Sequence, residues 1–206
     1  INLNNISVHI PVFDAPARSI RNSLINNSFG QNNNLKNKVV VIEALKNISI
    51  SLVKGDRLGV IGKNGSGKTT FLRVCCGAMV PTSGKVDISG LITPLIDISL
   101  GLEEDATGYE NIILKGLYLK RSPTFSKTLF NRIEKIANLG DVLNLPIRTY
   151  SSGMKMRLAY AIATAQQSQI LILDEWLSVG DAEWMEKMSE DINAFINASD
   201  IFIFAS

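Results

Sequence analysis

The sequence predicts an α/β fold with a mostly parallel sheet, an antiparallel β flank and a helical lobe over about 108–168. Short apolar runs rich in β-branched residues alternate with segments of helical periodicity, as in strands joined by crossover helices. Residues 170–173, Ile-Leu-Ile-Leu, are too apolar for either face to meet water, which is typical of a central parallel strand. A glycine-rich turn at 62–67 lies between an apolar run and a helical segment, which indicates a phosphate-binding strand–loop–helix unit.

The individual elements follow from local pattern. Apolar alternation and β-branched runs predict strands at 2–10, 39–42, 48–53, 58–61, 85–89, 170–173 and 201–204, with a short turn between the second and third. Helical periodicity predicts helices at 68–77, within 108–140, at 154–165 and at 181–196. Residues 14–38 are rich in asparagine, which predicts a loop-rich insertion with a short helix over 17–25. No internal repeat is visible, so we expect residues 1–206 to form a single domain.

Composition excludes several classes of protein. The 206 residues suffice to bury the core of one domain, and 46% of them are hydrophobic. The net charge is +2 and no block of like charges forms a basic stripe, so we expect no nucleic-acid partner. Cys75 and Cys76 are the only cysteines and stand in an apolar segment. We expect them to be small core residues and not metal or redox groups.

Nothing in the sequence predicts a membrane segment. The first residues have neither the basic nor the apolar region of a signal peptide. The longest apolar stretch, at 91–102, is interrupted by Pro94 and Asp97 and is too short to span a bilayer. If the protein serves a membrane process, we expect it to act from the cytosol through a partner.

The loop that begins at Gly62 has the residue types needed to hold a nucleotide triphosphate. Backbone N–H groups and the positive end of a helix can bind its negative oxygens, and glycine lets the backbone approach them. Lys68 can reach the β- and γ-phosphates, and Thr69 can hold Mg²⁺ through its hydroxyl. A chance glycine-rich turn is the alternative, but the flanking strand and helix favour binding. The predicted ATP-binding residues are Gly62, Lys63, Asn64, Gly65, Ser66, Gly67, Lys68, Thr69 and Thr70.

Two carboxylates follow the apolar strand at 170–173. Asp174 and Glu175 would lie at the carboxyl edge of the sheet, where ligands of open α/β sheets bind. Asp174 can contribute to the Mg²⁺ shell, and Glu175 can orient or deprotonate an attacking water. Acidic residues also occur at ordinary strand ends, so it is the phosphate loop upstream that makes this pair informative.

Residues 150–154, Tyr-Ser-Ser-Gly-Met, precede a predicted helix and form a second candidate anion site. By itself this segment could be a plain serine N-cap. With the other motifs, it resembles the Leu-Ser-Gly-Gly-Gln signature of ATP-binding-cassette (ABC) proteins. Ser151 and Gly153 match that signature, whereas Tyr150, Ser152 and Met154 depart from it.

The resemblance implies an ABC nucleotide-binding domain built on a P-loop NTPase core and paired head to tail with a second copy. Ser151, Ser152 and Gly153 of one copy would contact the ATP that the other copy holds. Residues 178–181 resemble the loop that crosses the dimer interface, which makes Asp181 a further binding residue. The family places its switch histidine beyond Ser206, so we expect a truncated chain, with His9 as a surface residue.

The signature also resembles that of ATPase subunits that export bacterial O-antigen, capsule or teichoic acid. Most cassettes have a metal-contacting glutamine in the segment that here spans 94–102, and Asp97 is the nearest polar replacement. An ordinary loop residue is an equal alternative for Asp97. Phe13 is the candidate for stacking on adenine, with a core phenylalanine as its alternative.

The resemblance implies an ATPase that uses ATP and Mg²⁺ to drive export of a lipid-linked surface polysaccharide. The chain would work at the cytoplasmic face of the bacterial inner membrane and contact a polytopic permease through a groove near 94–112. The alternatives are a non-transport ABC ATPase in translation or DNA repair, and the ATPase of an importer. Long coiled coils or paired cassettes are absent from this sequence, as is the importer-type glutamine segment.

Overall fold

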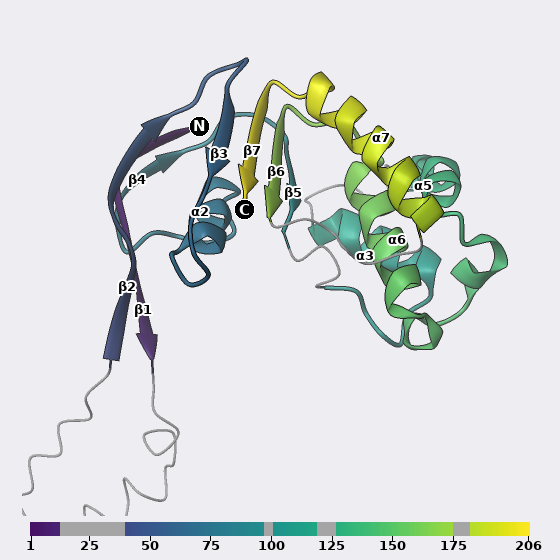
Figure 1. Ribbon diagram of the computed structural model, residues 1–206. Helices are drawn as coiled ribbons and strands as arrows, with labels where there is room; N and C mark the ends of the chain where they lie inside the picture. Colours follow the sequence, from purple (N-terminus) through teal and green to yellow (C-terminus); the bar gives the residue numbers. More distant parts are fainter. Residues whose placement is uncertain (13–39, 97–100, 119–126, 175–181) are drawn as a thin grey trace, which may run out of the picture.

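A computed structural model describes residues 1–12, 40–96, 101–118, 127–174 and 182–206 (Figure 1). Two sheets, one antiparallel and one parallel, lie beside a group of helices. The predicted α/β class is thereby confirmed, with both the parallel sheet and its antiparallel flank.

The antiparallel sheet has the order β2-β1-β4. Its strands are β1 (Asn2–Val12), β2 (Val40–Ser51) and β4 (Ser83–Asp87). The prediction of two strands around a turn within 39–53 is wrong, because β2 is continuous. The gap between the two predicted strands ends at a strand irregularity, where Asn47 adopts a left-handed conformation and its backbone N–H donates to Ser7 Oγ at 3.0 Å.

The second sheet is fully parallel and has the order β3-β7-β6-β5. Its strands are β3 (Arg57–Val60), β7 (Ile201–Ala205), β6 (Ile170–Asp174) and β5 (Ile92–Leu95). The apolar part of β6 is buried on both faces, as its sequence predicted. Strand β5 was not predicted. Among the described strands it pairs only with β6, and this edge position accommodates Pro94, which has no N–H to donate.

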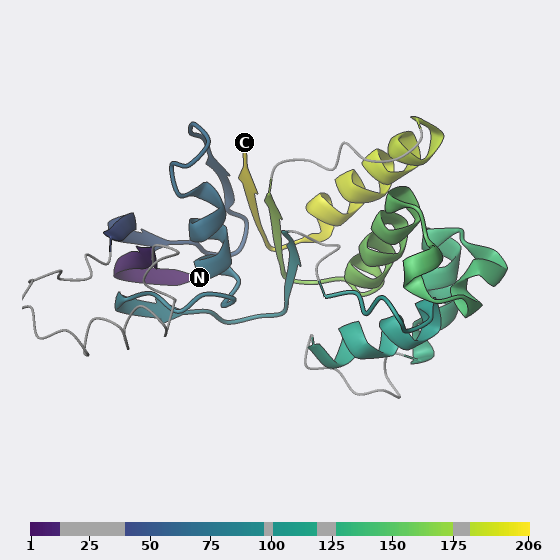
Figure 2. The same cartoon turned by 90° about the horizontal axis from the view of Figure 1, so that it is seen from below.

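Helix α2 (Lys68–Cys75) packs between the two sheets, and the other helices lie beyond the parallel sheet (Figures 1 and 2). The periodicity at 108–140 corresponds to α3 (Gly108–Tyr118) and α5 (Phe130–Ala137). The short 3₁₀ turns η2 (Gly140–Asn144) and η3 (Ile147–Thr149) lead to α6 (Ser152–Thr164). Helix α7 (Ala182–Ala198) follows β6 along the chain. None of these described helices combines the length and apolar character that crossing a membrane requires.

Three apolar clusters hold these layers together. The first joins α2 to both sheets, the second fills the space among α3, α5 and α6, and the third packs α6 and α7 against the parallel sheet. Cys75 is fully buried in the first cluster, and burial raises the pKa of its thiol to about 12. Its predicted role as a small core residue is confirmed.

Arg57 anchors β3, the strand that leads to the phosphate loop, through hydrogen bonds to the end of α7 and the residues after it. Its guanidinium donates to the carbonyl oxygens of Ser199 at 3.0 Å, Asp200 at 3.1 Å and Ile196 at 3.3 Å. Two of these carbonyls belong to the C-terminal end of α7 and the turn after it, where a cation is favoured. Strand β3 therefore has a fixed position from which to present the loop.

Candidate functional site

The loop after β3 makes a turn that depends on glycine. Gly65 and Gly67 have φ angles of 81° and 94°, a region that side chains with a Cβ rarely adopt. A Cβ on Gly67 would also lie 2.5 Å from the carbonyl oxygen of Ala44 in β2. The backbone of the loop thus touches the backbone of the antiparallel sheet.

The loop ends at the N-terminus of α2, which has the features of an anion site. The helix has no side-chain N-cap and no acidic residue in its first turn, so its amides are not satisfied by its own cap. Lys68 is only 9% exposed, and its ammonium donates to the carbonyl oxygens of Gly62 at 2.7 Å and Lys63 at 3.4 Å. A positive charge and helix-terminal N–H groups therefore converge here.

Thr69 and Asp174 meet at the other side of this helix turn. The Thr69 hydroxyl donates to the Asp174 carboxylate at 2.6 Å, although the two residues are 105 positions apart. No cluster of three or more histidine, cysteine or acidic ligands occurs within the described residues. Magnesium does not require one, because it commonly takes one or two protein oxygens with water and substrate phosphates. A hydroxyl beside a carboxylate fits that donor set.

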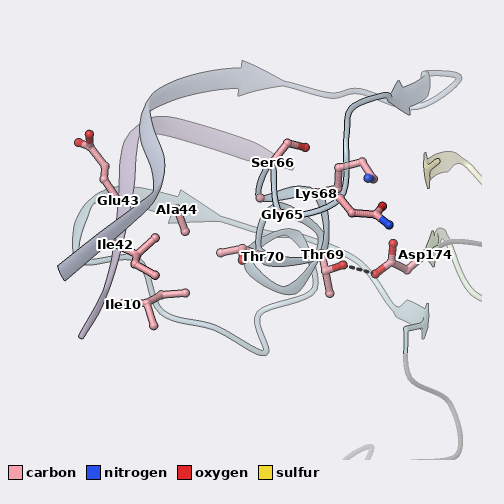
Figure 3. Close-up of a pocket in the computed structure, with 12 residues that line it drawn as sticks. Ile10, Ile42, Glu43, Ala44, Gly65, Ser66, Lys68, Thr69, Thr70 and Asp174 are labelled. Carbon is pink, nitrogen blue, oxygen red and sulfur yellow. Dashed lines mark hydrogen bonds between the residues drawn. The ribbon is translucent and has the colours of Figure 1, made fainter. Parts of the chain in front are cut away.

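The loop borders a cavity of about 490 Å³ (Figure 3). This volume is within the range of small-molecule sites. Its described lining includes the predicted residues Asn64, Gly65, Ser66, Gly67, Lys68, Thr69, Thr70 and Asp174. It also includes four residues that sequence reasoning missed, all from β1 and β2: Ile10, Ile42, Glu43 and Ala44. Local spacing could not have identified the β1 and β2 residues, since they join the cavity only through strand pairing.

The second candidate anion site lies elsewhere on the same chain. Ser151 caps α6, and its Oγ accepts from the Met154 N–H at 3.2 Å, as the N-cap interpretation predicted. Ser151 and Ser152 are exposed, and Ser151, Ser152 and Gly153 are absent from the described lining of the cavity. Figures 1 and 2 place α6 beyond the parallel sheet from α2.

Contacts with the loop before α3 fix the position of this exposed segment. Lys155 pairs with Glu104 at 2.6 Å, and Arg148 pairs with Asp105. Tyr150, which departs from the usual signature, is buried and donates its hydroxyl to the Val142 carbonyl at 2.6 Å. Burial raises the pKa of this hydroxyl. The aromatic residue therefore has a packing role in the helical cluster.

Four predicted site residues lie outside the described residues, namely Phe13, Asp97, Glu175 and Asp181. Glu175 directly follows Asp174, the last residue of β6. His9 is described, and it is exposed as predicted, with its ring 3.6 Å from the Glu43 carboxylate.

The comparisons with known proteins agree with this geometry. The family model described as ABC transporter matches residues 45–178. The chain is 40% identical over 203 residues to the O-antigen export system ATP-binding protein RfbE of Yersinia enterocolitica, covering 98% of this chain and 85% of that protein. It is 42% identical to the O-antigen export protein RfbB of Myxococcus xanthus over 71% of this chain. It is 40% identical to the teichoic acids export protein TagH of Bacillus cereus over 79% of this chain.

The matched part of this chain spans 34% of the length of the Myxococcus xanthus protein and 30% of the length of the Bacillus cereus protein. Among solved structures, an ATP-binding cassette in a dimeric post-hydrolysis state with ADP and phosphate has a TM-score of 0.70 at 19% identity. That comparison covers 100% of this chain and 87% of the other. This structural similarity shows that the chain has the fold of an ATP-binding cassette. The chain therefore belongs to the ABC transporter family, and its activity is the ATP hydrolysis of an ABC cassette.

Proposed function

We propose that this ATPase drives export of a lipid-linked surface polysaccharide of the O-antigen, capsule or teichoic-acid type. The observation that supports this most strongly is the 40% identity to an O-antigen export protein over nearly the whole of both chains. The protein would work at the cytoplasmic face of the bacterial inner membrane, where lipid-linked polymer and ATP are both available.

The phosphate loop, Thr69 and Asp174 have specific roles in this proposal. The loop amides and Lys68 hold the phosphates of ATP, and the Lys68 ammonium exchanges its carbonyl partners for phosphate oxygens. Thr69 and Asp174 hold Mg²⁺, the Asp174 carboxylate acting directly or through water. A cation bound by these two residues would supply positive charge that neutralises the phosphates.

Glu175 is proposed as the general base that orients and deprotonates the attacking water. It follows the metal-binding end of β6 by one residue, which suits a group acting on the terminal phosphate. Replacing Glu175 with Gln should preserve ATP binding and trap the ATP-bound dimer, visible by size-exclusion chromatography. If this variant hydrolyses ATP at an unchanged rate, Glu175 is not the general base.

A second copy of the chain is proposed to complete the site. Ser151 and Ser152 are exposed at the start of α6, and neither they nor Gly153 border the described part of the cavity of their own chain. Facing the terminal phosphate of the partner's ATP, the N-terminus of α6 would add donors at a helix end. Asp181 is proposed to lie at the same interface.

The permease is proposed to dock near α3. A cavity of about 430 Å³ opens there, with the acidic residues Asp105 and Glu110 beside the apolar Ile113 and Leu114. Leu114 and Leu117 are exposed large hydrophobic residues on the same helix. This combination suits an amphipathic cytoplasmic segment with basic residues. Asp97, which lies two positions after the last residue of β5 in the sequence, is kept as the proposed replacement for the usual glutamine.

Export can be tested in the source organism by replacing the chromosomal copy with Lys68→Met, which removes the charge at the phosphate site. We expect surface polysaccharide to be lost while its lipid-linked form accumulates inside the cell. Lys85→Met is the matched control, because Lys85 is an exposed residue of β4 away from the cavity. Normal surface polysaccharide in Lys68→Met, with a defect in translation, DNA repair or uptake, would contradict the proposal.

A further inference from the structure

Trp184, in the first turn of α7, contacts two residues of α6. It is 7% exposed, and its ring meets the Tyr160 ring edge-on, with the ring centroids 5.8 Å apart and an interplanar angle of 86°. The guanidinium carbon Cζ of Arg157 lies 5.6 Å from the centroid of the Trp184 ring. We propose that Trp184 is a positioning residue, which fixes the N-terminal ends of α6 and α7 in the arrangement that hydrolysis of the partner's ATP requires. This inference rests on the proposal that a second copy completes the site.

These contacts join the two helices near their starts. Helices α6 and α7 lie side by side in Figures 1 and 2, and Arg157 and Tyr160, three positions apart, share one face of α6. Helix α6 starts at Ser152, five residues before Arg157, and α7 starts at Ala182, two residues before Trp184. At about 1.5 Å per residue, the contact is within about 8 Å of both helix starts along their axes. It therefore lies close to both segments proposed for the dimer interface.

The cation above the ring distinguishes Trp184 from a residue that only fills the core. Trp184 belongs to the apolar cluster of α6, α7 and the parallel sheet, as does the partly buried Phe195 further along α7. Arg157 is half-buried, and an aromatic ring attracts a cation more strongly where water is partly excluded. Because this attraction depends on the ring face and on the charge, it is directional, whereas apolar packing is not. The contact can therefore set the orientation of α6 against α7.

The orientation of α6 matters because a helix start stabilises a phosphate only at hydrogen-bond distance. A displacement of about 1 Å can cost about a hundredfold in rate. The phosphate loop of the same chain precedes α2, which lies on the other side of the parallel sheet from α6 (Figures 1 and 2). Loss of the Trp184 ring should therefore slow hydrolysis of the ATP held by the other copy. ATP binding to the chain that carries the substitution should be unchanged.

The test uses mixed dimers with one intact composite site. One copy carries Lys68→Met and the other Gly153→Asp, so the intact site combines the phosphate loop of the Gly153→Asp copy with the helix starts of the Lys68→Met copy. Trp184→Leu removes the ring and keeps an apolar side chain. In the Lys68→Met copy it should lower the rate of ATP hydrolysis by the mixture about tenfold or more. In the Gly153→Asp copy it should leave that rate within about twofold, since that copy supplies only the phosphate loop.

Three further variants of the Lys68→Met copy separate the ring from its bulk. Trp184→Phe keeps an aromatic ring and should retain about a third of the rate or more. Phe195→Leu is the matched control, because Phe195 belongs to the same helix and apolar cluster but lies eleven residues beyond Trp184. It should leave the rate within about twofold. Arg157→Met should slow hydrolysis as Trp184→Leu does, and the two substitutions together should cost no more than either alone.

The positioning role is overturned if Trp184→Leu slows hydrolysis equally in both copies, if it changes the rate in neither, or if its effect multiplies with that of Arg157→Met. Isothermal titration calorimetry should give the chain carrying only Trp184→Leu an affinity for Mg²⁺–ATP within about twofold of the unsubstituted chain, and a larger loss would also overturn it. Arg157→Met, which keeps the buried ring, gives the same comparison between copies if Trp184→Leu does not fold. If the mixture without these substitutions hydrolyses no ATP, the proposed second copy itself fails.

Discussion

The Thr69 hydroxyl donates a hydrogen bond to the Asp174 carboxylate at 2.6 Å. This contact joins the first turn of α2 to the end of β6, which is the central strand between β5 and β7. A hydroxyl and a carboxylate held together at the carboxyl edge of a parallel sheet are well placed to share one cation. The arrangement therefore links the phosphate loop to the strand that precedes Glu175.

The first prediction concerns this pair. Thr69→Val removes the hydroxyl at nearly constant volume, and Thr69→Ser retains it. We expect Thr69→Val to lose most of the increase in ATP affinity that Mg²⁺ provides, whereas Thr69→Ser keeps it. Titrating ATP with and without Mg²⁺ measures that increase. Equal responses of both variants to Mg²⁺ would exclude the hydroxyl as a ligand.

The second prediction concerns the space around Gly67. Gly67 and Gly55 have similar φ angles, 94° and 98°, but only Gly67 has another atom where its Cβ would stand. Gly55→Ala should lower the free energy of unfolding by about 1–2 kcal/mol through backbone strain. Gly67→Ala should cost about 1–3 kcal/mol more, because the Cβ collides with the Ala44 carbonyl. Urea unfolding of both variants measures the difference, and equal losses would show that the collision is relieved without cost.

The third prediction concerns a buried hydroxyl in β5. Thr93 is 2% exposed, and its Oγ1 has no hydrogen-bond partner among the residues that the structure describes. Replacing Thr93 with Val keeps the shape and removes the unsatisfied group, so the free energy of unfolding should stay equal or rise by about 1 kcal/mol. Thermal and urea unfolding test this. A clear loss of stability would mean that the hydroxyl has a partner in solution.

The sequence predicted some parts of this fold well and others not at all. Strand β6 was predictable because four consecutive apolar residues leave few alternatives, and the loop at 62–70 because its glycines and lysine have fixed spacing. Strand β5 was missed because it is short and contains Pro94, which argues against a strand unless its position is at an edge. The gap between the β-branched runs at 39–42 and 48–53 suggested a turn, where β2 has only an irregularity near Asn47.

The end of the cavity that β1 and β2 form could not be predicted from spacing. Ile10 and Ile42 are far apart in the sequence and look like ordinary strand residues. Only the register of β1 against β2 makes them neighbours, and only the contact between Ala44 and Gly67 places them beside the loop. Pairing between distant strands depends on the whole fold and not on a local pattern.

The fourth prediction concerns Cys75. Its pKa of about 12 leaves about one thiol in ten thousand ionised at pH 8, so native protein should react slowly with iodoacetamide. Urea-unfolded protein should react quickly. Because the unfolded thiol ionises near pH 9.0 and the folded one does not, the contribution of Cys75 to stability should decline as pH rises above that value. Rapid alkylation of Cys75 itself in the folded chain at pH 8 would contradict its burial, whereas Cys76 is only partly buried.

Mixing two inactive variants tests most directly whether the ATP site is shared between two copies. Lys68→Met disables the phosphate loop, and Gly153→Asp places a negative charge at the helix end proposed to face the partner's ATP. In an equal mixture, half of the dimers contain one of each variant and hence one intact composite site. The account predicts recovery of about a quarter of the unsubstituted rate of ATP hydrolysis. A mixture as inactive as either variant alone would contradict it.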